Sequence, residues 1–205
     1  MTIYYGSNVA NGTLATASTM SSTTGGTETT AVTTVSGGGV WCETFSRAAS
    51  ETAVGAIGSP SGKGWVASPG SGSFATGNWS AAIALSIAAT ATVAWTVRFY
   101  KYNGSTYTSI GTIATSGASL GTTRTVISFS ATSMSGISFG SSDLLYVDLW
   151  MNDSTGTGGD NPKVYESNSA TQGVANDVQV TTSTFSPSGG VTHKIICDGF
   201  GGMFT

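Results

Sequence analysis

The sequence predicts an all-β protein, an antiparallel β-sandwich of jelly-roll type with extended N- and C-terminal arms. Short runs in which apolar and polar residues alternate recur along the chain, and clusters of Gly, Ser and Asn separate them. Helical periodicity never exceeds one turn. Eight or more short strands fit the two packed sheets of a jelly roll. We expect an N-terminal arm at 1–39, the sandwich at 40–185 and a C-terminal arm at 186–205.

The strongest single element is a hairpin over residues 92–112. Its first strand places Val93, Trp95, Val97 and Phe99 on one face and Thr92, Thr96, Arg98 and Tyr100 on the other. Because successive side chains of a strand point to opposite faces, the first face is wholly apolar and should cover the core. Asn103-Gly104 then predicts a type I′ turn, in which both central residues have positive φ. The return strand is expected at 106–112.

Shorter patterns predict the other strands. In chain order they are residues 2–5, 27–35, 40–45, a buried pair within 81–94, then 123–130, 144–151, 163–167 and 174–184. The clearest of them is 144–151, with Leu145, Val147, Leu149 and Met151 facing the core and Tyr146, Asp148 and Trp150 facing outward.

Composition points to a neutral surface covered by hydroxyl groups. Charged residues are 8% of the chain and the formal net charge is −3, whereas an average protein has about 25% charged residues. Such a surface suits a protein that is packed against neighbours or lies outside a cell. The seven basic residues are scattered, which argues against nucleic-acid binding. No signal peptide or membrane helix is predicted, so we expect synthesis in the cytoplasm and no membrane partner.

No motif identifies a reaction, and the chain is expected to be neither an enzyme nor a binder of a cofactor or metal. The one histidine, His193, has no orienting third group beside Cys197, as nucleophilic catalysis would require. A mid-strand acid at Asp148 lacks an obvious carboxylate partner. The oxygen-bearing residues Asn152, Asp153 and Asp160 do not follow the calcium-loop spacing.

Two further features stay open at this point. Cys42 and Cys197 either form a disulfide or remain free thiols. The candidate binding surface consists of aromatic residues around the hairpin turn and on the outward face of 144–151, namely Tyr100, Tyr102, Tyr107, Tyr146 and Trp150. Aromatic residues of this kind bind sugars or anchor protein interfaces, or they pair across strands within the sheet.

Several motifs resemble a β-sandwich domain of virion proteins from tailed bacteriophages. They are WTVRFYKYNGSTYTSIGT, the TTRTVISFS strand, the DLLYVDLWMN strand, Thr2-Ile3-Tyr4-Tyr5 and the GWVASP element at 64–69. The resemblance covers residues 64–184. It implies a structural protein without catalytic residues, a decoration or cement protein on the outer capsid surface, or else a part of the tail. Its partners would be the major capsid protein or other virion proteins and further copies of itself, often as a trimer.

The arms would then lace into adjacent subunits, since segments that order on assembly can wrap large surfaces. The candidate assembly contacts are Ile3, Tyr4, Tyr5, Ile195, Ile196, Phe200 and Phe204. The alternative function is a carbohydrate-binding or adhesin-type module with a glycan ligand, which would need a coplanar, exposed row of the aromatic residues. A β-sandwich hydrolase would need two carboxylates roughly 5–10 Å apart across a cleft.

Overall fold

The computed structural model describes residues 1–14, 17–29, 42–44, 59–60, 62, 64–87, 91–115, 118–153 and 163–189. Within these ranges the chain consists of strands and turns with no helix, which confirms the all-β prediction. No helix in the described ranges could therefore reach across a lipid bilayer.

The strands divide into a large sheet and a small one. The large sheet contains β1 (Thr2–Ala10), β2 (Ala17–Ser21), β3 (Glu28–Thr29), β4 (Cys42–Thr44), β5 (Gly64–Ala67), β7 (Gly77–Ser86), β8 (Ala91–Tyr102), β9 (Tyr107–Ala114), β10 (Ala118–Leu120), β11 (Thr125–Met134), β13 (Leu144–Asp153), β14 (Lys163–Val164), β15 (Glu166–Ser167) and β16 (Val178–Thr182). The small sheet contains β6 (Gly72–Phe74), β12 (Ile137–Phe139) and β17 (Phe185–Pro187).

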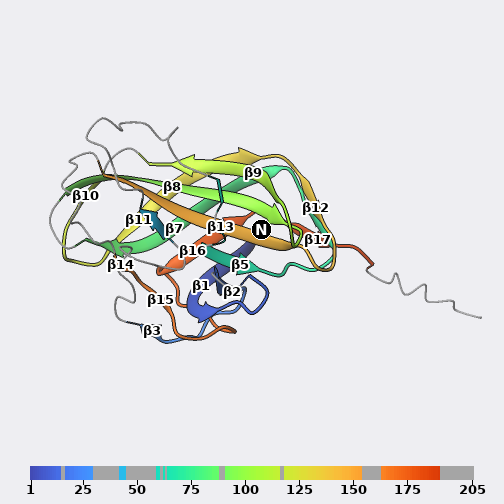
Figure 1. The fold of residues 1–205 in the computed structure, drawn as a ribbon, viewed down its shortest axis with the longest axis horizontal. Helices are drawn as coiled ribbons and strands as arrows, with labels where there is room; N and C mark the ends of the chain where they lie inside the picture. The colour runs from blue at the N-terminus through green and yellow to red at the C-terminus, as the bar shows by residue number, and fades with distance from the viewer. Residues whose placement is uncertain are drawn as a thin grey trace, which may run out of the picture.

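The large sheet curls toward a barrel. Its strands follow the order β10-β8-β13-β5-β2-β1-β16-β7-β11, and β9 pairs with β8 beside β10. The edge strands β9 and β11 approach each other, and the side chain of Met134 on β11 packs on Gly111 of β9. Figure 1 shows the long strands running side by side, with β10 and β14 at one end and β12 and β17 at the other.

The expected purely antiparallel arrangement is wrong in detail, and neither the two-sheet sandwich nor the jelly-roll order is confirmed. The pairs β2–β5, β4–β13 and β1–β15 are parallel, so the large sheet is mixed. Because the large sheet is curved, side chains from its two halves meet in the interior. A sandwich would instead need a second, separate sheet of similar size. Alternation along single strands predicts which faces are buried, but it cannot distinguish a curled sheet from two stacked ones.

One apolar core fills the interior, and thirteen of the described strands contribute to it. Its largest fully buried side chains are Trp65 on β5, Trp79 on β7 and Trp95 on β8. The predicted apolar faces are confirmed where the structure describes them: Trp95, Val97, Phe99, Leu145, Val147 and Leu149 all lie in this core. The three Trp side chains and their neighbours form one continuous cluster, so the interior is packed with side chains.

The small sheet covers one end of the barrel with aromatic rings. Phe74 on β6 lies at its centre, with ring centroids 5.1 Å from Trp79, 5.4 Å from Phe139 on β12 and 4.8 Å from Phe185 on β17. These separations and the mostly edge-to-face angles are the favourable geometry for aromatic pairs. We call this three-stranded sheet the end cap.

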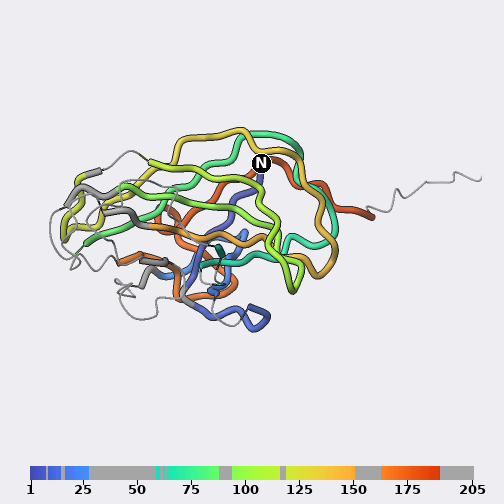
Figure 2. Tube along the Cα trace, turned by 45° about the horizontal axis from the view of Figure 1, so that its top comes forward, coloured from blue at the N-terminus to red at the C-terminus, as the bar shows by residue number. Residues whose placement is uncertain are grey.

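The predicted N-terminal arm is wrong for residues 2–10 and 17–21. Strand β1 lies inside the large sheet, between β2 and β16, and Thr2 pairs with Thr182. Figure 2 shows the N-terminus beside the chain near residue 180. Of the proposed assembly contacts, Tyr4 is part of the core, Tyr5 is buried and Ile3 is half-buried. A strand with partners on both edges is part of the domain.

At the other end, Phe185–Pro187 belong to the end cap, so the expected boundary at 186 falls inside β17. The remaining proposed contacts, Ile195, Ile196, Phe200 and Phe204, lie outside the described residues, as do His193 and Cys197. Neither the C-terminal arm nor a Cys42–Cys197 disulfide is tested by the described part of the chain.

The central hairpin is confirmed, but its turn is not the predicted type I′. Tyr102 pairs with Tyr107, so four residues connect β8 and β9. Gly104 has a φ of +97°, whereas no positive φ occurs at Asn103. Instead the Asn103 side-chain oxygen accepts hydrogen bonds from the backbone N–H groups of Ser105 and Thr106, at 3.1 and 2.9 Å. The Asn side chain thus organises the turn by local hydrogen bonding.

Gly173→Ala is expected to destabilise the fold by about 1–3 kcal/mol, because the new methyl group would overlap the Cβ of Tyr5 on β1. Chemical denaturation followed by Trp fluorescence measures the loss. Gly12→Ala is the matched control, since nothing lies within 4 Å of its added Cβ and its φ is not positive. Equal stabilities of the two variants would contradict the close packing of residue 173 on β1.

Candidate functional site

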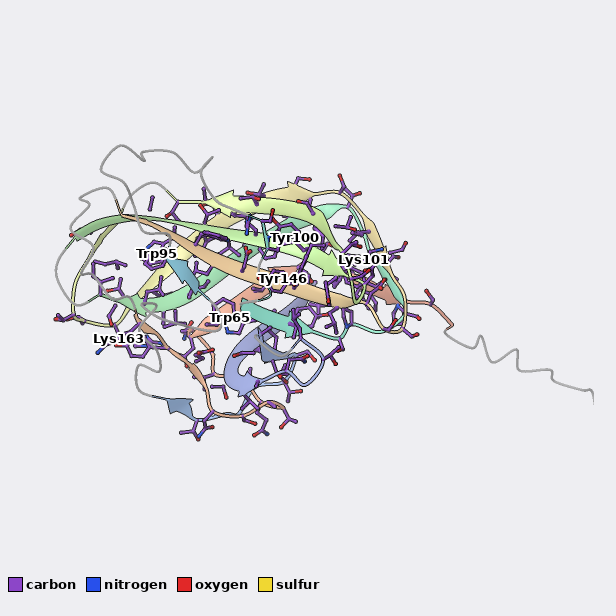
Figure 3. The ribbon with its side chains drawn as sticks, viewed as in Figure 1. Trp65, Trp95, Tyr100, Lys101, Tyr146 and Lys163 are labelled. Carbon is purple, nitrogen blue, oxygen red and sulfur yellow. The ribbon has the colours of Figure 1, made fainter. Side chains whose placement is uncertain are left out.

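The five aromatic residues singled out in the sequence lie on one face of the sheet, opposite the core. The register pairs Tyr100 with Tyr146 and Tyr102 with Tyr107. Ring centroids are 4.6 Å apart for Tyr102–Tyr107, 5.0 Å for Tyr107–Tyr146 and 6.0 Å for Tyr100–Tyr146. Figure 3 shows Tyr100 and Tyr146 beside each other on neighbouring strands. We call Tyr100, Tyr102, Tyr107, Tyr146 and Trp150 the outer aromatic row.

Most of the outer aromatic row is buried, which contradicts its interpretation as an exposed platform. Tyr146 is 0% exposed, Trp150 4% and Tyr100 9%. Tyr100 and Tyr146 belong to a second apolar cluster with Ala17, Val66 and Leu144, against which Leu14 also packs. The chain between β1 and β2 therefore contributes to covering this face. Only Tyr102 and Tyr107, next to the hairpin turn, keep intermediate exposure.

A buried ion pair lies in the same face, further along the two strands. Arg98 on β8 and Asp148 on β13 are directly opposite each other, and the Arg98 Nε donates to Asp148 Oδ1 at 2.9 Å. A second hydrogen bond joins Arg98 Nη2 to Asp148 Oδ2, so the pairing is bidentate. The guanidinium carbon also lies 4.7 Å from the Trp150 ring centroid and 5.3 Å from that of Tyr100.

These contacts identify Asp148 as a structural acceptor. Burial raises the pKa of Asp148, and the hydrogen bonds and charge of Arg98 oppose that rise. Both carboxylate oxygens accept from one guanidinium that aromatic rings enclose. A general acid also needs access to a substrate, and Asp148 is only 2% exposed. The pair therefore joins β8 to β13 across the face.

The exposed end of the row adjoins a small polar rim. The Tyr102 hydroxyl donates to the Gly104 carbonyl at 2.8 Å, which fixes its ring over the turn. Lys101 Nζ lies 3.7 Å from a carboxylate oxygen of Asp143 and donates to the Ser138 carbonyl at 3.3 Å. Two half-buried tyrosines beside one partly exposed ion pair form the part of the predicted surface that a ligand can reach.

A second polar cluster was not predicted. Glu166 on β15 is 0% exposed and accepts a hydrogen bond from the indole Nε1 of Trp65 at 2.9 Å. Asp177, at the start of β16, is also 0% exposed and accepts from Arg124 Nη2 at 2.7 Å. The sequence shows Glu166 only as one of several acids near a loop and gives Asp177 no partner. No local sequence signal marks either acid as buried.

The oxygen-bearing residues considered as calcium ligands do not form a site in the described part of the chain. The side chains of Asn152 and Asp153 and the whole of Asp160 lie outside what the structure describes. Among the described residues, no group of three His, Cys, Asp or Glu side chains is arranged to hold a metal ion. No protein-family model, curated protein or solved structure matches the chain.

Proposed function

We propose that this chain is a non-enzymatic structural subunit of a virion, a decoration protein that binds the outer surface of a tailed-phage head as a homo-oligomer. The observation that carries the proposal is the chemistry of the exposed sheet surface. Together with the motif resemblance described above, this surface favours extensive contact with neighbouring protein.

The exposed surface of β9 and β11 consists of small hydroxyl and apolar side chains. Its members are Thr108, Ser109, Thr112 and Ala114 on β9 and Thr125, Val126, Ser128, Ser130, Ala131, Thr132 and Ser133 on β11. Neither strand contains a charged residue. Burying such a surface against a partner leaves no unpaired charge behind, so the interface forms without the cost of desolvating a charge. We call it the hydroxyl face.

The outer aromatic row gives less support to the alternative, a carbohydrate-binding or adhesin-type module. That function needs several aromatic rings on an exposed plane, and three of the five are buried. The specific observation in its favour is the pair Tyr102–Tyr107, half-buried and with ring planes only 32° apart. A glycan-binding function would therefore rest on this pair alone.

Pelleting with empty heads tests the proposal. Heads assembled from the major capsid protein encoded in the same genome should carry the protein into the pellet at a fixed, saturable ratio. Because the hydroxyl face has no charge, raising the salt from 0.05 to 0.5 M should change the affinity less than about threefold. A protein that stays in the supernatant and binds a glycan in a Tyr107-dependent manner would replace this proposal with the alternative.

Paired variants identify the surface used. Ser128→Lys with Ser130→Lys places two charges on the hydroxyl face and should weaken pelleting at least about tenfold. Ser22→Lys with Ser188→Lys is the control, since both of these residues are also exposed and lie on other parts of the chain. Equal loss in the two double variants would show that the hydroxyl face is not the contact.

A further inference from the structure

A segment with two very short strands lies at the side of the large sheet. We call residues 163–177 the strap. Its strands β14 and β15 have two residues each, and they pair with β7 and with β1 and β3. Figure 1 shows β15 and β3 together at the edge of the molecule, below the long strands. Elements with so few ladder bonds are the first to open locally.

The strap also holds the chain that leads out of β2. The Gly173 carbonyl accepts from the N–H groups of Gly25 and Gly26 at 3.1 and 3.0 Å, and the Gly173 N–H donates to the Thr23 carbonyl at 2.7 Å. Further along, Asn168 donates its N–H to the Thr27 carbonyl at 3.2 Å. Opening the strap would therefore free residues 23–29 at the same time.

Two buried carboxyl groups anchor the strap to the barrel. Glu166 reaches Trp65, a core residue of β5, and Asp177 at the end of the strap is held by Arg124. Both acids have no exposed surface, whereas the Arg124 side chain is 32% exposed. The guanidinium donates to Asp177 and so favours an ionised Asp177, and the negative charge of Asp177 in turn favours a protonated Glu166.

The groups around Glu166 favour that state. Burial raises the pKa of Glu166 to about 8, and the nearby negative charge of Asp177 adds to the rise, while the Trp65 hydrogen bond opposes it. Five other titratable or charged residues belong to the described elements that pack here. The Arg124 guanidinium lies 5.5 Å from the Tyr165 ring, and the Tyr165 hydroxyl lies 3.2 Å from that of Ser86. The remaining three are Tyr5, which packs against Gly173, Lys163, which is exposed, and Glu28, which is opposite Ser167 in the register of β3 and β15.

We propose that Glu166 is a pH-operated latch, whose protonated carboxyl holds the strap against the barrel and whose ionisation in water opens the strap while the barrel stays folded. An exposed glutamic acid loses its proton near pH 4.5. Between that pH and about 8 the closed strap binds one proton more than the open strap. The open population therefore rises about tenfold per pH unit in this window and levels off above it. The closed state is most stable on the acidic side.

Hydrogen exchange of the full chain, corrected for the intrinsic rate at each pH, tests the latch. In the wild-type protein the opening constant of amides at 163–173 should rise about tenfold per unit between pH 5 and 7.5, with unchanged protection in β8 and β13. Glu166→Gln keeps an oxygen acceptor for Trp65 and should abolish the pH dependence. Asp143→Asn, at a surface carboxylate, should retain it. The same pH dependence in wild type and Glu166→Gln would overturn the latch.

A direct titration keeps the test decisive if Glu166→Gln fails to fold. The carboxyl carbon of Glu166 in wild-type protein, followed by carbon NMR, should have its inflection near pH 8. Asp177→Asn removes the neighbouring negative charge and should move that inflection to lower pH. An inflection between pH 4 and 5 in the wild-type protein would contradict the proposal, because the closed strap would then bind no extra proton.

Discussion

Replacing Arg98 with Met should lower the free energy of unfolding by about 3–5 kcal/mol, the largest effect we expect from a single substitution outside the apolar core. The substitution leaves the Asp148 carboxylate buried between β8 and β13 without the guanidinium that now donates to both its oxygens. An uncompensated buried charge is far more costly than the loss of one exposed salt bridge. Urea denaturation of the two proteins at pH 7 measures the difference.

The double variant Arg98→Met with Asp148→Leu is the informative control. With both charges removed, apolar side chains next to Trp150 and Tyr100 should restore most of the lost stability, since a buried ion pair is often replaceable by packed apolar residues. An additive loss in the double variant would show that the pair itself stabilises the sheet. A loss below about 1 kcal/mol in Arg98→Met would show that water reaches Asp148.

Phe74→Ala should lower the free energy of unfolding by a similar amount, about 3–5 kcal/mol, because it empties the centre of the end cap. The ring is 1% exposed and contacts Trp79, Phe139 and Phe185 together. Its removal leaves a cavity at the end of the barrel. Side chains of β7 in the large sheet and of β12 and β17 in the small sheet would have to move to fill it. Thermal unfolding and urea denaturation both report the loss.

Phe185→Ala provides the comparison within the same cap. The Phe185 side chain is only half-buried at the outer side of Phe74, so its truncation should cost less than half as much. Equal losses for the two variants would mean that β17 carries as much of the packing as Phe74 does. That result would contradict the central place of Phe74 in the end cap.

The parts of the fold that could be predicted from the sequence are those with local signals. Period-two alternation is sufficient to assign Trp95, Val97 and Phe99 to the core, and Asn103-Gly104 to a connection between two strands. The predicted type I′ turn is wrong, because the Asn103 side chain accepts hydrogen bonds from the N–H groups two and three residues along and so stabilises a four-residue loop.

The errors arise where distant segments meet. The alternation of residues 144–151 shows that Tyr146 and Trp150 share a face, but burial of that face depends in part on Leu14 and Ala17, which are more than 120 positions away. Strand β1 is a second case in which distant residues determine burial. Its Gly6 is buried so closely that an added Cβ would lie 2.7 Å from Val178 Cγ1 and 2.9 Å from the indole nitrogen of Trp65, and no local pattern records these contacts.

The candidate site divides in the same way. The aromatic residues were recognisable because they lie on one hairpin and one strand, and the structure places them together. The Glu166–Asp177 pair was not recognisable, since its partners Trp65 and Arg124 come from other strands and turns. Single acids in polar sequence surroundings carry no local signal of burial.

The heat stability of empty heads, measured with and without saturating protein, tests the proposed function most directly. A decoration protein binds the assembled shell and not its separated subunits, so the rupture temperature should rise once the hydroxyl face is docked. We expect a rise of several degrees at a fixed number of copies per head, and no rise with Ser128→Lys plus Ser130→Lys. An unchanged rupture temperature at protein concentrations of tens of micromolar, with no protein bound to the heads, would contradict a decoration role.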